Sequence, residues 1–193
     1  MQVIEKIQNM PTYDDPWYHG YVDDFLPQDY YNTMCDKIDA VTTGIKEGEG
    51  HAVNNQTIID ITKITGEDEF FWKDFLSHFT TPEFLQAMQD ISKISGKFNE
   101  IRFDIHRCEK GFKLNQHNDV KGWLSDMASL QIYCARDMNM SNEGTTLLGE
   151  TEKLVEYIPN RAWMFACAEN TFHKVEPISA YRTSILMKFG VRK

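Results

Sequence analysis

Two segments of the chain carry side chains that could bind one metal ion. The first is His117-Asn118-Asp119, which places an imidazole and a carboxylate two residues apart. On an extended strand such side chains point the same way, roughly 6–7 Å apart along the chain, so both could reach one ion. By itself the pair is weak evidence, because a chain with six histidines and 29 acidic residues has about one such pair by chance.

The second segment is His173-Lys174-Val175-Glu176-Pro177, and Arg182 and Ser184 follow it at the start of another expected strand. Two histidines and one carboxylate form the facial triad of non-haem iron sites, which leaves coordination positions open. A structural zinc site is instead closed by four protein ligands. The planar fork of an arginine can bind an acid bidentately, and Ser184 shares the strand face of Arg182. An isolated arginine is more often a surface residue, so the hypothesis depends on both segments acting together.

The elements that must position these residues change in character near residue 98. From about residue 23 to 95, apolar residues recur at three- and four-residue spacing, which predicts amphipathic helices. Thr81-Pro82 has the pattern of a helix N-cap followed by proline, and the aromatic series from Phe70 to Phe79 is interpreted as core. The Gly-rich stretch 44–55 is expected to be a loop or an irregular hairpin. Farther on, a period of two predicts short strands at 101–105, 130–134, 145–148, 154–157, 162–167, 172–175 and 182–189.

This order of elements predicts an α+β fold. Many short strands at close spacing favour an antiparallel sandwich or barrel such as a jelly roll. Residues 1–97 would be mainly helical support and residues 98–193 the β-core. We expect one integrated domain, 1–193, because the aromatic faces of the helices need a surface to bury against.

Composition narrows the class of protein. The chain has 193 residues and a formal net charge of -9, which argues against a generic polyanion binder. Its four cysteines include no Cys-x-x-Cys pair, so we expect reduced thiols rather than a zinc knuckle or a disulfide framework. No apolar run approaches the ~18–20 residues of a membrane span, and the first residues do not resemble a signal peptide. We therefore expect a cytoplasmic protein without a membrane partner.

The carboxy-terminal half resembles the iron(II)- and 2-oxoglutarate-dependent dioxygenases, especially their prolyl 4-hydroxylase-like branch. The family pattern is His-x-Asp, a distal His, and an Arg nine or ten residues later followed by x-Ser. The chain matches this pattern in order and spacing from His117 to Ser184. Four further matches extend the resemblance over roughly Arg102 to Lys188: Arg107-Cys108-Glu109-Lys110-Gly111, Leu130-Gln131-Ile132-Tyr133, Glu143-Gly144-Thr145-Thr146-Leu147 and Tyr157-Ile158-Pro159.

The chain also departs from the family pattern at three places. Cys108 stands where the pattern usually has Tyr, and Glu143 takes the place of the first of two glycines. Asn160-Arg161 replaces the usual Gly-containing turn. None of these departures falls on the metal or arginine positions, so they bear on the substrate more than on the reaction class.

The resemblance implies a double-stranded β-helix (jelly-roll) core and a ferrous ion held by His117, Asp119 and His173. It also implies 2-oxoglutarate as cosubstrate, with its far carboxylate bound by Arg182 and with Tyr133 and Ser184 beside it. Dioxygen would be the oxidant and ascorbate a supporting reductant. The reaction would hydroxylate an unactivated C–H bond and release succinate and CO2.

The resemblance leaves two classes of substrate open. A peptidyl proline is the first candidate, solely because of the branch that the motifs resemble, and a small molecule would fit the same iron site. Trp123 and Arg136 lie in expected loops, and loops at a barrel mouth often select substrate. Both are candidate substrate contacts, with plain surface turns as the alternative.

Two other functions remain as alternatives. One is a non-catalytic metal-binding jelly roll that acts as a sensor or interaction module; Arg182 and Ser184 argue against it, because a metal holder needs no clamp for a diacid. The other is a nucleic-acid demethylase of the same superfamily, which the acidic net charge and the lack of a basic cluster disfavour. The remaining histidines have no ligand-like neighbours and are interpreted as structural or exposed.

Overall fold

The computed structural model describes residues 2–41, 45–47, 55–120, 122 and 124–192. The helices are α1 (Val3–Gln8), α2 (Gln28–Ala40), α3 (Glu69–Phe79) and α4 (Pro82–Ser92), with 3-10 turns η1 (Ile61–Lys63) and η2 (Gly66–Asp68). The strands are β1 (Thr12–Tyr13), β2 (His19–Val22), β3 (Ile45–Glu47), β4 (Gln56–Asp60), β5 (Glu100–Cys108), β6 (Leu114–His117), β7 (Leu124–Tyr133), β8 (Thr145–Leu148), β9 (Glu152–Val155), β10 (Ala162–Ala166), β11 (Phe172–Val175) and β12 (Arg182–Arg192).

The strands form two antiparallel sheets. The larger sheet has the order β1-β2-β10-β7-β12-β5-β4-β3, and the smaller has the order β6-β11-β8-β9. From β5 onward the chain passes back and forth between the sheets, apart from the β8–β9 hairpin. The predicted mixture of helices with antiparallel sheets is therefore confirmed. Because β6 and β11 lie in the smaller sheet and β12 in the larger, the predicted site residues come from both.

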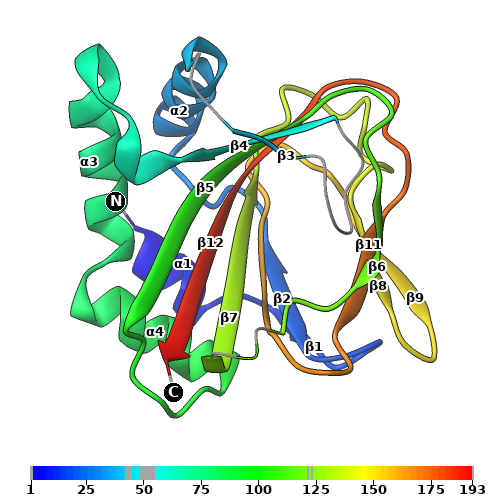
Figure 1. Cartoon of the computed structure of the whole chain (residues 1–193). Helices are drawn as coiled ribbons and strands as arrows, with labels where there is room; N and C mark the ends of the chain where they lie inside the picture. The colour runs from blue at the N-terminus through cyan, green and yellow to red at the C-terminus, as the bar shows by residue number, and fades with distance from the viewer. Residues whose placement is uncertain (1, 42–44, 48–54, 121, 123, 193) are drawn as a thin grey trace.

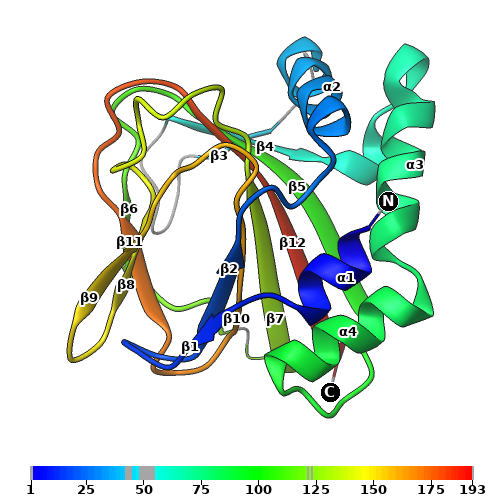
Figure 2. The same cartoon turned by 180° about the vertical axis from the view of Figure 1, so that it is seen from behind.

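The molecule is built in three layers. Figures 1 and 2 show the helices on one side of the larger sheet and the smaller sheet on the other. Alternation along β12 explains this placement, because successive side chains of a strand point to opposite faces. Ile185, Met187 and Phe189 are fully buried in the core cluster that includes the helices, whereas Leu186 and Lys188 line a cavity between the sheets. One strand thus joins the core to the site.

The helices follow the sequence signals closely. The Thr81 hydroxyl accepts a hydrogen bond from the Phe84 amide at 3.1 Å, and Pro82 opens α4, as the N-cap pattern predicts. Trp72, Phe75 and Phe79 are buried in the core, as predicted for the aromatic series. None of the described helices combines the length and apolar composition that a membrane crossing requires.

Some expectations for the amino-terminal half were wrong. Phe70 was assigned to the core, but it is 82% exposed because it lies on the outer face of α3. Strands β1, β2 and β4 were not predicted, and together with β3 they extend the larger sheet at both edges. Part of the stretch predicted as a loop or hairpin, 48–54, lies outside the described residues, while β3 and β4 on either side of it pair antiparallel. The division near residue 97 and the single-domain organisation stay predictions.

Candidate metal centre

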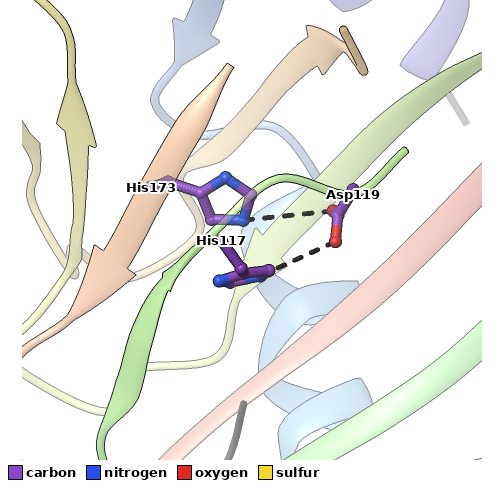
Figure 3. Close-up of side chains that lie close together, drawn as sticks. All are labelled: His117, Asp119 and His173. Carbon is purple, nitrogen blue, oxygen red and sulfur yellow. Dashed lines mark ion pairs between the residues drawn. The ribbon is translucent and has the colours of Figure 1, made fainter. Parts of the chain in front are cut away.

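Three side chains meet between the two sheets, as the sequence predicted. His117 ends β6 and His173 lies on β11, and the two residues are direct cross-strand partners. Asp119 follows in the segment after β6, so the two residues do not lie on one extended strand. His117 Nε2 lies 3.7 Å from Asp119 Oδ1, and His173 Nε2 lies 4.0 Å from Asp119 Oδ2 (Figure 3). One ligand atom from each residue lies within 4.8 Å of the others, so one ion could be held by all three.

Backbone carbonyls fix the orientation of both imidazoles. His117 Nδ1 lies 2.9 Å from the Asn115 carbonyl, and His173 Nδ1 lies 3.1 Å from the Thr171 carbonyl. A carbonyl only accepts hydrogen bonds, so each Nδ1 must carry the proton and donate. Each Nε2 is then left with a lone pair directed toward Asp119, which is the tautomer a metal ligand requires.

The charge states also suit a divalent cation. Burial lowers the pKa of His173 to about 4, so this imidazole is neutral near pH 7. Burial alone would raise the pKa of Asp119, but attraction to Lys188 and to the two histidines lowers it overall. Two imidazoles and one carboxylate are the donor set of an open non-haem iron site, so the residues present fit a ferrous ion.

A cavity of about 330 Å³ connects the triad to a second group of polar side chains. Its volume is at the small end of the range for ligand pockets. Arg182 lines it together with all three triad residues. The other polar or charged residues that line it are Gln56, Arg102, Asp104, His106, Ser129, Gln131, Thr145 and Lys188.

Arg182 is a buried cation with no counter-ion among the described residues. The residue is 4% exposed, and no carboxylate among the described residues lies within ion-pair distance of its guanidinium. One Nη donates to the Thr145 hydroxyl at 3.2 Å, while the buried Nε has no hydrogen-bond partner. The guanidinium lies 5.2 and 5.3 Å from the ring centroids of Tyr133 and Tyr157. A buried guanidinium that faces a cavity and has no described carboxylate partner could bind an anion there.

Tyr133 and Ser184 lie behind the cavity wall. The Tyr133 hydroxyl donates to the Thr145 hydroxyl at 2.9 Å, and Ser184 accepts a hydrogen bond from the Gln131 amide at 2.7 Å. Thr145 and Gln131 line the cavity, whereas Tyr133 and Ser184 are not among its lining residues. Both predicted residues therefore reach the cavity through a partner. Strand periodicity could have identified Gln131 as a site residue, because it lies two residues before Tyr133 and shares its strand face.

The structure tests one of the two predicted substrate residues. Trp123 lies outside the described residues. Arg136 lines a separate hollow of about 260 Å³ beside α2, where it forms ion pairs with Asp36 and Asp39. Sequence reasoning in turn missed Lys188, whose ammonium lies 3.2 Å from Asp119 Oδ2. Lys188 follows Arg182, Ser184 and Leu186 at steps of two residues, so its side chain points to the same face of the strand. This alternation could have identified Lys188 as a site residue from the sequence.

Comparisons with known proteins place this geometry in a structural context. No family model matches the chain, and no curated protein sequence matches it. Among solved structures, a prolyl-4-hydroxylase of Pseudomonas putida matches with a TM-score of 0.69 and 16% identity, over 99% of this chain and 98% of that chain. A prolyl hydroxylase of Trichoplax adhaerens, in complex with a peptide fragment of a hypoxia inducible factor, matches with a TM-score of 0.67 and 13% identity, over 98% and 87%.

A third structure widens the comparison. It is an oxidoreductase of the 2OG-Fe(II) oxygenase family from Burkholderia pseudomallei, with a TM-score of 0.66 and 12% identity, over 91% of this chain and 88% of that chain. Identities this low establish a shared fold, and they leave chemistry to be argued from the site. The dioxygenase resemblance of the sequence is confirmed at that level: the chain has the fold of the 2-oxoglutarate- and Fe(II)-dependent oxygenases, with prolyl hydroxylases among the proteins that share it.

Proposed function

We propose that the protein is an Fe(II)- and 2-oxoglutarate-dependent dioxygenase that hydroxylates an unactivated C–H bond. The observation that carries the proposal is the buried guanidinium of Arg182, unpaired with any described carboxylate, in the same cavity as a His-Asp-His set. A metal-binding module without catalysis would need the three ligands but would gain nothing from an unpaired buried cation, which is costly for the free protein.

Each residue would have one task. His117, Asp119 and His173 would hold the ferrous ion through two Nε2 atoms and a carboxylate oxygen. Arg182 would bind the distal carboxylate of 2-oxoglutarate, with Thr145 fixing the guanidinium and Tyr133 fixing Thr145. A bound ferrous ion with dioxygen supplies the oxidation, in which the 2-oxo acid becomes succinate and CO2 while one oxygen atom enters the substrate.

The apolar walls of the cavity would keep water away from the reacting centre. Trp163 and Phe165 line it, and the ring of Phe165 lies 5.2 Å from the ring of His173. Excluding water strengthens the attraction between Arg182 and its anion, and it limits side reactions of the oxidant. Ascorbate would return the iron to the ferrous state after a turnover in which 2-oxoglutarate is consumed without hydroxylation of a substrate.

The fold and setting follow from the same proposal. We infer that the two sheets form the double-stranded β-helix core of one domain. We place the protein in the cytoplasm, because its four cysteines form no disulfide and a reducing compartment keeps iron ferrous. The candidate substrate that the Trichoplax adhaerens neighbour suggests is a prolyl residue of a peptide, and a small molecule is the other candidate.

Succinate formation tests the reaction class. The purified protein is loaded anaerobically with Fe(II) and 2-oxoglutarate, exposed to air with ascorbate, and assayed for succinate and CO2. We expect both products in equal amounts, slowly without substrate, and none above background from His173→Ala. Equal succinate from wild type and His173→Ala, or none from either, would reject the enzyme.

A further inference from the structure

Lys188 is a second cavity cation that the proposed function leaves without a task. Its side chain is 17% exposed and lines the cavity. Lys188 lies on the same face of β12 as Arg182, six residues along, so the two backbones are about 20 Å apart. Arg182 contacts Thr145, whereas Lys188 contacts the triad through Asp119. The two cations therefore serve different regions of the cavity.

In the metal-free protein, the charge of Lys188 is balanced by Asp119. Among the described residues, Asp119 is the single carboxylate within ion-pair distance of its ammonium. A metal ion that binds the triad would also bind the carboxylate of Asp119. Even where one carboxylate oxygen keeps its contact with Lys188, the negative charge would be shared between two cationic partners. Metal binding would thus leave Lys188 with a deficit of negative charge.

A charge count over the cavity leads to the same result. Of the described lining residues, three are cationic (Arg102, Arg182 and Lys188) and two are carboxylates (Asp104 and Asp119). A ferrous ion adds two positive charges, and doubly charged 2-oxoglutarate offsets them. Arg102 already forms an ion pair with the buried Asp104. One positive charge therefore remains in the loaded cavity, and Lys188 is the group that carries it.

A hydroxyl group stands beside this cation. Ser129 is the cross-strand partner of Lys188 on β7, and both side chains line the cavity. An ammonium and a neighbouring hydroxyl together can bind a carboxylate at two points. The cavity, of about 330 Å³, must also hold 2-oxoglutarate, so the space that remains suits a small molecule.

We propose that the substrate is a small carboxylic acid whose carboxylate binds Lys188 and Ser129, with the reacting carbon a few bonds from that carboxylate. This inference rests on the proposed function and narrows its substrate. Lys188 lies 3.2 Å from a triad carboxylate oxygen, so an acid bound there has its neighbouring carbons close to the metal. A single remaining positive charge matches the single negative charge of a carboxylate.

Matched pairs of acids and amides test the proposal. The probes are the free L-amino acids, which share a carboxylate and differ in side chain, each compared with its own carboxamide. Each probe is added to the anaerobic Fe(II)–2-oxoglutarate protein, and the shift of the visible charge-transfer band reports binding without turnover. Succinate formation is then measured in air. We expect at least one acid to shift the band and to raise succinate formation, with its amide at least tenfold weaker.

Variants of Lys188 identify the group responsible. Lys188→Met and Lys188→Gln should raise the half-saturating concentration of that acid at least tenfold, and Lys188→Arg should restore it to within a few-fold of wild type. Lys73→Met, which removes an exposed lysine on α3, serves as the matched control and should leave acid binding unchanged. Ser129→Ala should weaken acid binding less than Lys188→Met does.

The outcomes separate this inference from the proposed function. A charge-transfer band and slow succinate formation, combined with no difference between any acid and its amide, would overturn the small-acid substrate and leave the dioxygenase intact. The same conclusion follows if Lys188→Met binds the acid as wild type does, or if an end-capped prolyl peptide stimulates succinate formation while no acid does. Absence of the band itself in wild type would instead reject the proposed function.

Discussion

The surroundings of Arg182 favour the binding of an anion in the cavity. Burying a cation without a partner is unfavourable, and stacking over Tyr133 and Tyr157 offsets only part of that cost. The orphaned Nε of Arg182 adds an unsatisfied donor to an already costly arrangement. A protein that keeps such a group in a cavity gains from it when an anion binds.

Replacing Arg182 by leucine should remove affinity for the distal carboxylate alone. Hydrogen bonds to charged groups contribute about 1.5–3 kcal/mol, so we expect 2-oxoglutarate to bind the Fe(II) protein about 10- to 100-fold more weakly. Binding of 2-oxobutanoate, which lacks the distal carboxylate, should change little. Anaerobic titration of the charge-transfer band measures both dissociation constants.

The control for this substitution lies on the same strand. Arg192→Leu removes an exposed arginine that pairs with Glu100 at the far end of β12, and it should leave both titrations unchanged. If Arg182→Leu binds 2-oxoglutarate as tightly as wild type does, or if it loses both 2-oxo acids equally, Arg182 is not the anchor of the distal carboxylate.

His173 makes the stability of the metal-free protein depend on pH. Burial lowers its pKa from 6.5 to about 4, so between these values the unfolded chain binds the proton more readily than the folded one does. The folded state therefore keeps its full stability above pH 6.5 and loses it as the pH falls toward 4. This residue should account for a loss of about 3 kcal/mol over that window.

Chemical denaturation of the metal-free protein at pH 7 and at pH 4.5 measures this effect. His173→Gln should reduce the pH dependence of the unfolding free energy, because glutamine does not titrate. A His173→Gln protein with the same slope as wild type would show that His173 is protonated equally in both states.

Among the elements, the β8–β9 hairpin positions Thr145 against Arg182. Gly144 precedes β8, and a Cβ atom built on it would lie 1.9 Å from the Val155 carbonyl oxygen and 2.9 Å from the Tyr157 amide nitrogen. This close backbone approach is why only glycine fits there. The next residue is Thr145, whose hydroxyl contacts both Arg182 and Tyr133.

Gly144→Ala should therefore both destabilise the protein and weaken the binding of 2-oxoglutarate. Overpacking against backbone costs about 1–3 kcal/mol, which denaturation would detect, and 2-oxoglutarate should bind more weakly because Thr145 shifts. Gly122→Ala is the control for stability, since no atom of the described residues lies within 4 Å of the Cβ position of Gly122. A Gly144→Ala protein with wild-type stability would contradict the close approach of β8 to β9.

At the scale of the whole molecule, the site lies between two sheets, so ligands should hold the sheets together. His117 and His173 belong to the smaller sheet and Arg182 to the larger. A ligand that binds only the folded state stabilises it by about 2.7 kcal/mol at a concentration 100 times its dissociation constant. For a chain of this size, that corresponds to a rise in Tm of about 5–10 °C.

Thermal unfolding with Mn(II), which binds such sites without starting turnover, checks this expectation. Mn(II) alone should raise Tm, and 2-oxoglutarate should raise it further in the presence of Mn(II). Arg182→Leu should keep the first increment and lose most of the second, and His117→Ala should lose both. If Mn(II) raises the Tm of His117→Ala by as much as it raises that of wild type, the metal binds elsewhere.

Local patterns in the sequence explain which parts could be predicted. The N-cap at Thr81 and the alternation along β12 depend on neighbouring residues, so they can be read without the fold. The triad and Arg182 were found because a resemblance linked segments that are far apart in the chain. Without the sheet order, the same residues would have remained separate weak signals.

Contacts between distant segments explain the rest. β4 pairs with β5 in the larger sheet, and no pattern within β4 itself predicts this pairing. Arg136 was a reasonable loop candidate for substrate, but α2 places Asp36 and Asp39 against it. From the sequence alone, Lys188 is one residue of an expected strand, and the fold is what places it next to Asp119. Each of these outcomes depends on a long-range contact that a single sequence does not state.

The central claim is that His117, Asp119 and His173 hold one ferrous ion in the cavity where Arg182 binds a diacid. Anaerobic titration of the metal-free protein with Fe(II), followed by 2-oxoglutarate, measures both parts in one cuvette. We predict one Fe(II) per chain and a visible charge-transfer band that requires both components and is absent from His117→Ala. A wild-type protein without the band, or a His117→Ala protein with an undiminished one, would contradict the claim.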